Sequence, residues 1–211
     1  MKSYHISFIR HGRTKANDCG MYIGTTDFPL TDKGRSELYD KLEQFVYPKV
    51  ERVYSSPLLR CTETAEILFP DREIVMADEF SELHFGKFEG KTAEELIHNE
   101  EYRTWLKGGM DAKAPEGESV AELCVRTYRG LHRILMEMMD EDMRHVAIVT
   151  HAGVISNAIS CFGLPKYDPK ELVCEAGEGF EVQTSAMLWQ QSQAFELLGI
   201  TPLAPELSED E

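Results

Sequence analysis

The sequence predicts an α/β protein with three layers (α/β/α), in which helices cover both faces of a mostly parallel sheet. Short apolar runs that end abruptly in polar residues alternate along the chain with longer segments of helical periodicity. The composition, 42% hydrophobic and 28% charged, is that of a globular protein. The 211 residues suffice for a substantial core, and no linker, repeat or low-complexity tract divides them.

The first half of the chain alternates strands and helices. The predicted elements are a strand over 4–10, a helix over 31–46, a strand over 51–55, a helix over 57–68 and a strand over 73–77. Thr31 is expected to cap the first of these helices. Ser56 and Pro57 predict an N-cap followed by proline at the first position of the second helix.

The second half continues the alternation. It predicts helices within 92–107, a helix over 119–140, a strand over 145–150, a helix over 152–162, and final strands near 184–190 and 194–199. Ser119 and Glu122 have the S-x-x-E spacing of a capping box. The apolar run before His151 is typical of a buried parallel strand. The final pair would form a hairpin and supply one antiparallel edge strand, so the whole arrangement is Rossmann-like.

We expect one domain over residues 1–204. Within it, residues 81–117 are rich in charge and punctuated by glycine and proline in "KGGMDAKAPEGES". Such a segment predicts a small excursion that caps a pocket rather than a part of the sheet. Residues 205–211 carry four acids and predict a flexible, solvated tail.

Composition also limits the classes of partner. The net charge of −15 argues against nucleic acid and anionic membranes, although a local arginine cluster can still attract a small anion. No apolar run approaches the ~20 residues that cross a bilayer, and the first residues lack a secretory pattern, so we expect a cytoplasmic protein. The five scattered cysteines contain no CxxC, which predicts reduced, mostly buried thiols rather than a zinc site or disulfides.

The residues that could carry chemistry collect where predicted strands end. The stretch "FIRHGRT" ends the first strand at Arg10 and His11. "SSPLLR" places Arg60 just after the strand 51–55, and "VTHAG" places His151 just after the strand 145–150. Ligands of parallel sheets bind beyond the carboxyl ends of the strands, so we expect these four side chains to converge.

Two arginines and two histidines at one sheet edge suit phosphoryl transfer. The planar fork of arginine matches phosphate oxygens and keeps its charge. A histidine among arginines has a lowered pKa, which keeps the imidazole neutral and nucleophilic. A helix that begins at His151 adds backbone N–H groups that favour an anion. The pattern therefore predicts a histidine that accepts a phosphoryl group.

Five separated blocks of the chain support this interpretation. They are "RHGRTKAN" (10–17), "GTTDFPLTDKG" (24–34), "YSSPLLRCTETA" (54–65), "ELHFGKFEGKT" (82–92) and "VTHAG" (149–153), with "PEGES" before the long helix. In this order they resemble the histidine phosphatase superfamily, in its phosphoglycerate-mutase-like branch. Within it, "GKFEGKT" resembles alpha-ribazole phosphatases and broad-specificity small-molecule phosphatases.

The resemblance implies a metal-independent phosphomonoester hydrolase that needs no cofactor and acts on a small phosphorylated metabolite. His11 would be the phosphorylated nucleophile, and Glu82 the proton donor. Arg10, Arg60 and His151 would bind the transferring group. Substrate contacts are expected from Asn17, Gly24, Thr25, His84, Phe85 and Ala152.

Several points stay open at this stage. Arg13 stands where many relatives have an acid or glutamine, and Ile23 where glutamine or arginine is common, which affects substrate contacts. The alternatives are a mutase and a non-catalytic module that binds phosphorylated ligands. Leu83 favours a phosphatase, because mutases of the family resemble one another in having arginine there. A metal-binding function is not supported, because the histidines lack the spacing of metal ligands. The oligomeric state is open, and the edge hairpin could pair two copies into a homodimer.

Overall fold

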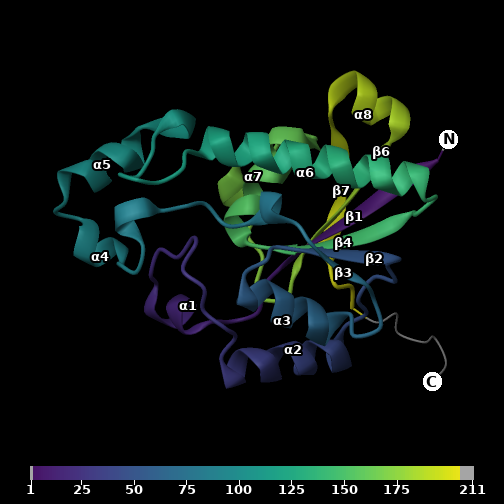
Figure 1. Cartoon of the computed structure of the whole chain (residues 1–211), viewed down its shortest axis with the longest axis horizontal. Helices are drawn as coiled ribbons and strands as arrows, with labels where there is room; N and C mark the ends of the chain where they lie inside the picture. The colour runs from purple at the N-terminus through teal and green to yellow at the C-terminus, as the bar shows by residue number, and fades with distance from the viewer. Residues whose placement is uncertain (1, 205–211) are drawn as a thin grey trace.

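One seven-stranded sheet with helices on both faces makes up the body of the protein (Figure 1). The structure is a computed structural model and describes residues 2–204. The strand order is β3-β2-β4-β1-β6-β7-β5. The strands are β1 (Ser3–Arg10), β2 (Arg52–Ser55), β3 (Ile74–Met76), β4 (His145–Thr150), β5 (Gly163–Leu164), β6 (Gly179–Ser185) and β7 (Phe195–Thr201).

The predicted fold class is confirmed by this topology. Strand β6 runs antiparallel to both of its neighbours, whereas every other pairing among the named strands is parallel. The antiparallel strand lies toward one edge of the sheet, with β7 and β5 beyond it. Strands β1, β4 and β2 point the same way, so their carboxyl ends meet at one edge.

The central strands are apolar on both faces because each face is covered by helices. On β4, Val146 and Ile148 belong to the core on one face, and Ala147 and Val149 belong to the core on the other. The first core includes residues of α6 (Val120–Asp140) and α7 (Ala152–Phe162), and the second includes residues of α2 (Asp32–Gln44) and α3 (Leu59–Leu68). Figure 1 shows these two pairs on opposite sides of the sheet.

Most predicted elements are confirmed to within one or two residues. The helix over 31–46 ends at Gln44, and Thr31 caps it by accepting a hydrogen bond from the Gly34 N–H (2.9 Å). Ser119 and Glu122 form the predicted capping box of α6. The short helix α1 (Lys15–Cys19), which Thr14 and Asn17 cap reciprocally, was not predicted.

Two predictions are wrong. The strand near 184–190 is instead the end of β6 followed by helix α8 (Ala186–Ser192), because the Ser185 hydroxyl accepts from the Leu188 N–H (3.2 Å) and starts a helix. The predicted cap of the helix over 57–68 is also wrong: the helix begins at Leu59 with no side-chain cap, and Ser56 hydrogen-bonds a histidine side chain instead.

Residues 81–117 leave the sheet and return at the start of α6. They contain the short helices η2 (Gly86–Phe88), α4 (Ala93–Leu96), α5 (Glu100–Lys107) and η3 (Gly109–Asp111). Phe88, Leu96, Tyr102 and Ala114 form a small core of their own. Figure 1 shows α4 and α5 beyond one end of the sheet. The remaining short helices are η1 (Asp78–Phe80) and η4 (Pro169–Glu171).

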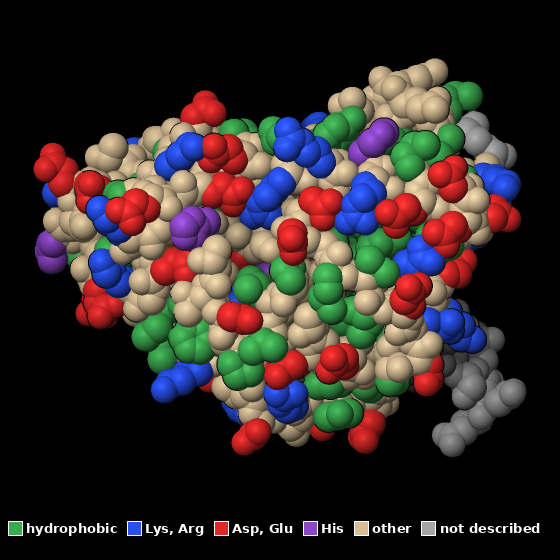
Figure 2. Space-filling view, viewed as in Figure 1, with side chains coloured by type: hydrophobic (Ala, Val, Ile, Leu, Met, Phe, Trp, Pro, Cys, Tyr) green, Lys and Arg blue, Asp and Glu red, His purple; other side chains and the backbone are tan. Residues whose placement is uncertain are grey.

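The surface carries acidic side chains among fewer basic ones (Figure 2). Among residues 2–204, no helix is both long and apolar enough to cross a membrane. Cys124 on α6 and Cys161 on α7 are free thiols whose sulfur atoms lie 3.2 Å apart, a proximity that their sequence spacing could not reveal. The acidic tail predicted at 205–211 lies outside the described residues.

Candidate active site

The first strand carries His11 to the edge where the parallel strands end. The His11 N–H donates to the Thr150 carbonyl (2.9 Å), so β1 and β4 stay paired up to this residue. The chain then turns at Gly12, whose N–H donates to the Thr64 hydroxyl (2.8 Å). A Cβ at Gly12 would lie 2.8 Å from a Leu38 methyl group, so this close approach to α2 favours glycine.

The hydrogen bond of the His11 ring determines which nitrogen is free. Nδ1 lies 2.7 Å from the Gly12 carbonyl oxygen. A carbonyl only accepts, so Nδ1 carries the proton and Nε2 keeps its lone pair. Burial, with Arg60 and Arg10 nearby, lowers the pKa of His11 to about 3. Near neutral pH the ring is therefore uncharged and Nε2 is available as a nucleophile.

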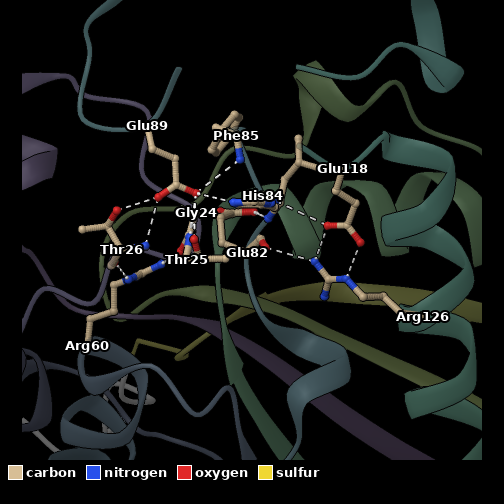
Figure 3. Close-up of polar contacts among 11 residues, drawn as sticks. Gly24, Thr25, Thr26, Arg60, Glu82, His84, Phe85, Glu89, Glu118 and Arg126 are labelled. Carbon is tan, nitrogen blue, oxygen red and sulfur yellow. Dashed lines mark hydrogen bonds and ion pairs between the residues drawn. The ribbon is translucent and has the colours of Figure 1, made fainter. Parts of the chain in front are cut away.

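Arg60 is held rigidly in the first turn of α3, with only 2% of its surface exposed. Its two terminal nitrogens donate to the carbonyl oxygens of Thr26 (3.0 Å) and Gly24 (2.9 Å) (Figure 3). Gly24 fits because a Cβ would lie 2.0 Å from the Leu83 carbonyl oxygen. The loop that carries these carbonyls thus fixes the direction of the guanidinium group.

Glu89 in turn holds that loop. Its carboxylate accepts from the N–H groups of Thr25 (2.9 Å) and Thr26 (3.0 Å) and from both of their hydroxyls (Figure 3). Burial opposes ionisation, but these hydrogen bonds lower the pKa of the Glu89 carboxyl. Glu89 is therefore an ionised anchor that supports Arg60 through the backbone of residues 24–26.

Glu82 is the carboxyl group of the site. Burial raises the pKa of this carboxyl group. Two contacts partly oppose the shift: the Leu83 N–H donates to Oε1 (2.8 Å), and Arg60 contributes its positive charge. Gly153 at the start of α7 packs directly on it, since a Cβ there would lie 2.6 Å from Oε1. A carboxyl with a raised pKa beside a phosphate site can donate a proton.

An ion pair between Arg126 on α6 and Glu118, which lies just before that helix, holds the Glu82 segment. Arg126 donates to the carbonyl oxygens of Glu79 (2.8 Å) and Glu82 (3.0 Å), and its other contacts are with the Glu118 carboxylate (2.7 and 2.9 Å). The Glu118 N–H donates to the His84 carbonyl (2.8 Å). Figure 3 shows this clamp on the side of Glu82 away from Arg60.

A cavity of about 170 Å³ opens above His11. It is lined by Arg10, His11, Thr14, Asn17, Met21, Tyr22, Ile23, Arg60, Glu82, Phe85 and Ala152. Asn17 gives its side-chain oxygen to the cap of α1, accepting from the Thr14 N–H (2.9 Å) and hydroxyl (2.9 Å), which leaves its amide N–H₂ free to donate. The Arg10 Nε is buried without a partner, and one terminal nitrogen donates to the Cys174 carbonyl (2.8 Å).

Seven of the residues predicted for the site therefore line one cavity. They are Arg10, His11, Asn17, Arg60, Glu82, Phe85 and Ala152. His151 lies behind them, fully buried, with Nδ1 accepting from the Arg60 Nε (3.3 Å) and Nε2 donating to the Ser56 hydroxyl (3.0 Å). Its ring centroid is 5.1 Å from that of His11. Burial is the main cause that holds the pKa of His151 well below its ordinary value, and the nearby His11 and Arg60 lower it further.

Three predicted substrate contacts lie outside this cavity. The Gly24 carbonyl faces Arg60, and the Thr25 N–H and hydroxyl face Glu89. His84 borders a neighbouring open cavity, 3.9 Å from Glu89. The roles of Glu89, Glu118 and Arg126 could not be predicted, because a single charged residue in a loop or helix is usually solvated. Met21 and Tyr22 had no motif to mark them.

A family model described as "Histidine phosphatase superfamily (branch 1)" matches residues 6–178. The chain belongs to this superfamily. One relative is the adenosylcobalamin/alpha-ribazole phosphatase of Salmonella typhimurium, 30% identical over 156 residues, which cover 72% of this chain and 76% of the relative. Another is phosphoglycerate mutase-like protein 4 of Arabidopsis thaliana, 32% identical over 157 residues, which cover 71% of this chain and 67% of the relative.

Solved structures show the same histidine phosphatase fold. The alpha-ribazole phosphatase of Shigella flexneri superposes with a TM-score of 0.78 at 22% identity, covering 97% of this chain and 99% of that one. A mycobacterial glucosyl-3-phosphoglycerate phosphatase gives a TM-score of 0.79 at 20% identity, covering 94% of this chain and 98% of that one. The predicted family, and with it phosphoryl hydrolysis or transfer through a phosphohistidine, is confirmed.

Proposed function

We propose that this protein is a metal-independent phosphomonoester hydrolase that acts on a small phosphorylated metabolite through a phosphohistidine at His11. One observation carries the proposal: a neutral imidazole with a free Nε2 shares a cavity with two arginines and a carboxyl of raised pKa. The arginines supply the positive charge that phosphoryl transfer requires. Among residues 2–204, no group of three or more His, Cys, Asp or Glu side chains is placed to hold a metal ion.

The proposed reaction has two steps. His11 Nε2 attacks phosphorus, the bond from phosphorus to the ester oxygen breaks, and Glu82 gives its proton to the leaving alkoxide. Arg10 and Arg60 stabilise charge on the transferring oxygens, and the Asn17 amide adds a donor. Water then attacks phosphorus, the Glu82 carboxylate takes the water's proton, the bond between phosphorus and His11 Nε2 breaks, and phosphate leaves with the imidazole restored. His151 supports this site by holding Arg60 and packing on His11.

The mutase alternative has less support in the site. Leu83 is only 7% exposed and packs in the main core, so no cation stands at the position where a mutase would hold a second anionic group. We further propose that residues 1–204 are a single catalytic domain, that the enzyme is cytoplasmic, and that its partner is the small substrate rather than nucleic acid. Pairing of two copies through β6 and β7 remains a proposal as well.

The decisive experiment is hydrolysis of p-nitrophenyl phosphate in EDTA, with quenching that avoids acid so that a phosphohistidine survives. We expect turnover in EDTA and phosphate on His11, and neither with His11→Ala. Retained turnover in a folded His11→Ala variant would contradict the nucleophile assignment. Absence of both turnover and label in the natural protein would favour a mutase or a binding module.

A further inference from the structure

The part of the cavity that lies beyond the phosphate groups has an apolar wall. Arg10, His11 and Arg60 form one pole, where the phosphate would bind. Met21, Tyr22, Ile23 and Phe85 make up half of the remaining lining, beside Thr14, Asn17, Glu82 and Ala152. Glu82, the proton donor to the leaving oxygen, belongs to the same cavity, so the alcohol half of an ester departs toward this wall. The wall offers area for burial and few polar partners.

The aromatic part of the wall is preorganised. The ring of Tyr22 lies 5.2 Å from that of Phe85 and 5.8 Å from that of Trp105 between centroids, and Phe85 lies 6.1 Å from Trp105. The Tyr22 hydroxyl is hydrogen-bonded to the Tyr102 hydroxyl (2.7 Å), so its polar end is engaged inside the protein. Rings held in this way lose little freedom on binding, and they present faces and edges that suit another ring.

The cations around the phosphate pole are neutralised by acids. Two neighbouring cavities adjoin the site, one of about 540 Å³ through Arg10 and Asn17, and one of about 380 Å³ through Glu82. Their other cations are ion-paired: Arg13 with Asp18 (2.8 Å), Lys41 with Glu178, Lys113 with Glu122, and Arg126 with Glu118 (2.7 Å). In the described part of the chain, the arginine and lysine side chains that line these three cavities are therefore paired with acids, except Arg10 and Arg60, which are the cations assigned to the phosphate.

We infer that the natural substrate is a monophosphate ester whose alcohol half is uncharged and aromatic, and that the site selects against esters with a second anionic group. The inference rests on the proposed function. The aromatic wall supplies the attraction, and the paired cations within an acidic protein supply the discrimination. A carboxylate placed against this wall would lose its water and gain no partner in return.

Three esters of primary alcohols test the inference, because their leaving groups are chemically similar: benzyl phosphate, 2-phosphoglycolate and phosphoethanolamine. They carry an aromatic, an anionic and a cationic group respectively. We expect kcat/KM for benzyl phosphate to exceed that for 2-phosphoglycolate about tenfold or more, since one good aromatic contact with its buried area is worth about this factor. Phosphoethanolamine should fall between them. Equal values, or preference for 2-phosphoglycolate, would overturn the inference.

Two variants probe the wall itself. Phe85→Ala should lower kcat/KM for benzyl phosphate about tenfold and leave 2-phosphoglycolate nearly unchanged. Ile23→Arg should raise kcat/KM for 2-phosphoglycolate about fivefold, as expected for a partly exposed ion pair. Tyr39→Ala, an exposed aromatic on α2 outside these cavities, is the matched control. If Phe85→Ala loses fold, seen by circular dichroism, the Ile23→Arg result alone decides, and no gain for 2-phosphoglycolate counts against the inference.

The same assays separate failure of the inference from failure of the proposed function. Turnover of p-nitrophenyl phosphate with a His11 label, but without preference for benzyl phosphate, would leave the hydrolase intact and reject the aromatic substrate. No turnover of any ester and no label would reject the hydrolase, and the inference with it.

Discussion

The two buried histidines of the site differ in which nitrogen carries the proton. His11 donates from Nδ1 to the Gly12 carbonyl, whereas His151 accepts at Nδ1 from Arg60 and donates from Nε2 to Ser56. Only His11 borders the cavity. These neighbours leave Nε2 of His11 free and use both ring nitrogens of His151 in hydrogen bonds, which supports the proposed division of roles between the two imidazoles.

Glu82→Gln tests the acid at the level of a single residue. Glutamine keeps the size of the side chain but cannot give a proton, so hydrolysis of benzyl phosphate should fall about 100-fold or more. Hydrolysis of p-nitrophenyl phosphate, whose leaving group needs little protonation, should change far less. Because burial raises the pKa of Glu82, the natural enzyme should lose alkyl ester activity at a pH above the ordinary carboxyl range. The variant should lack this alkaline limb, and equal losses for both esters would contradict the assignment.

Helix α6 contributes to the site through the ion pair between Arg126 and Glu118. Lysine has one nitrogen and cannot reach both carbonyls and the carboxylate at once, so Arg126→Lys should let the Glu82 segment shift. We expect kcat for benzyl phosphate to fall about tenfold with little change in KM, because small errors in placement are costly.

The pH profile separates placement of Glu82 from its electrostatics. The positive charge of Arg126 lowers the pKa of Glu82 in part, and lysine keeps that charge. The alkaline limb should therefore stay at the same pH in Arg126→Lys while kcat drops. Arg129→Lys, an exposed substitution on the same helix, is the control and should behave as the natural enzyme. A shifted limb with unchanged kcat would mean that Arg126 acts only by its charge.

Elements buried on both faces could be predicted well from the sequence. β4 carries a continuous apolar run and β1 is rich in apolar residues, and the residues just past their ends are His151 and His11. The strand predicted near 184–190 is wrong because the apolar residues of this segment fit a strand or a helix equally well. The Ser185 cap favours the helix. The supporting contacts of Ser56, Glu89 and Arg126 could not be predicted, since each joins segments far apart in the chain.

At the scale of the whole molecule, an acidic protein with a net charge of −15 maintains a positive pole inside one cavity. Arg10 and Arg60 lie at the sheet edge, and most other nearby cations are paired with acids. The field that attracts phosphate is therefore local, and low dielectric around the buried guanidinium groups strengthens it. The same arrangement keeps His11 neutral, so the site's charge also affects the stability of the fold.

The folded protein should lose stability as the pH falls from about 7 to about 5 because of His11. Its pKa is about 3 when folded and near the ordinary 6.5 when unfolded, so below pH 6.5 the unfolded state binds the extra proton. From these values the free energy of unfolding should drop by about 2 kcal/mol over this interval. Buried His151 acts in the same direction, and Glu82, whose pKa is raised, acts in the opposite one.

Denaturant unfolding of the natural protein and of His11→Gln, in phosphate-free buffer at both pH values, isolates the contribution of His11. We expect a shallower pH dependence in the variant. The same dependence in both proteins would mean that His11 titrates normally when folded, and that a neutral nucleophile does not come from this environment.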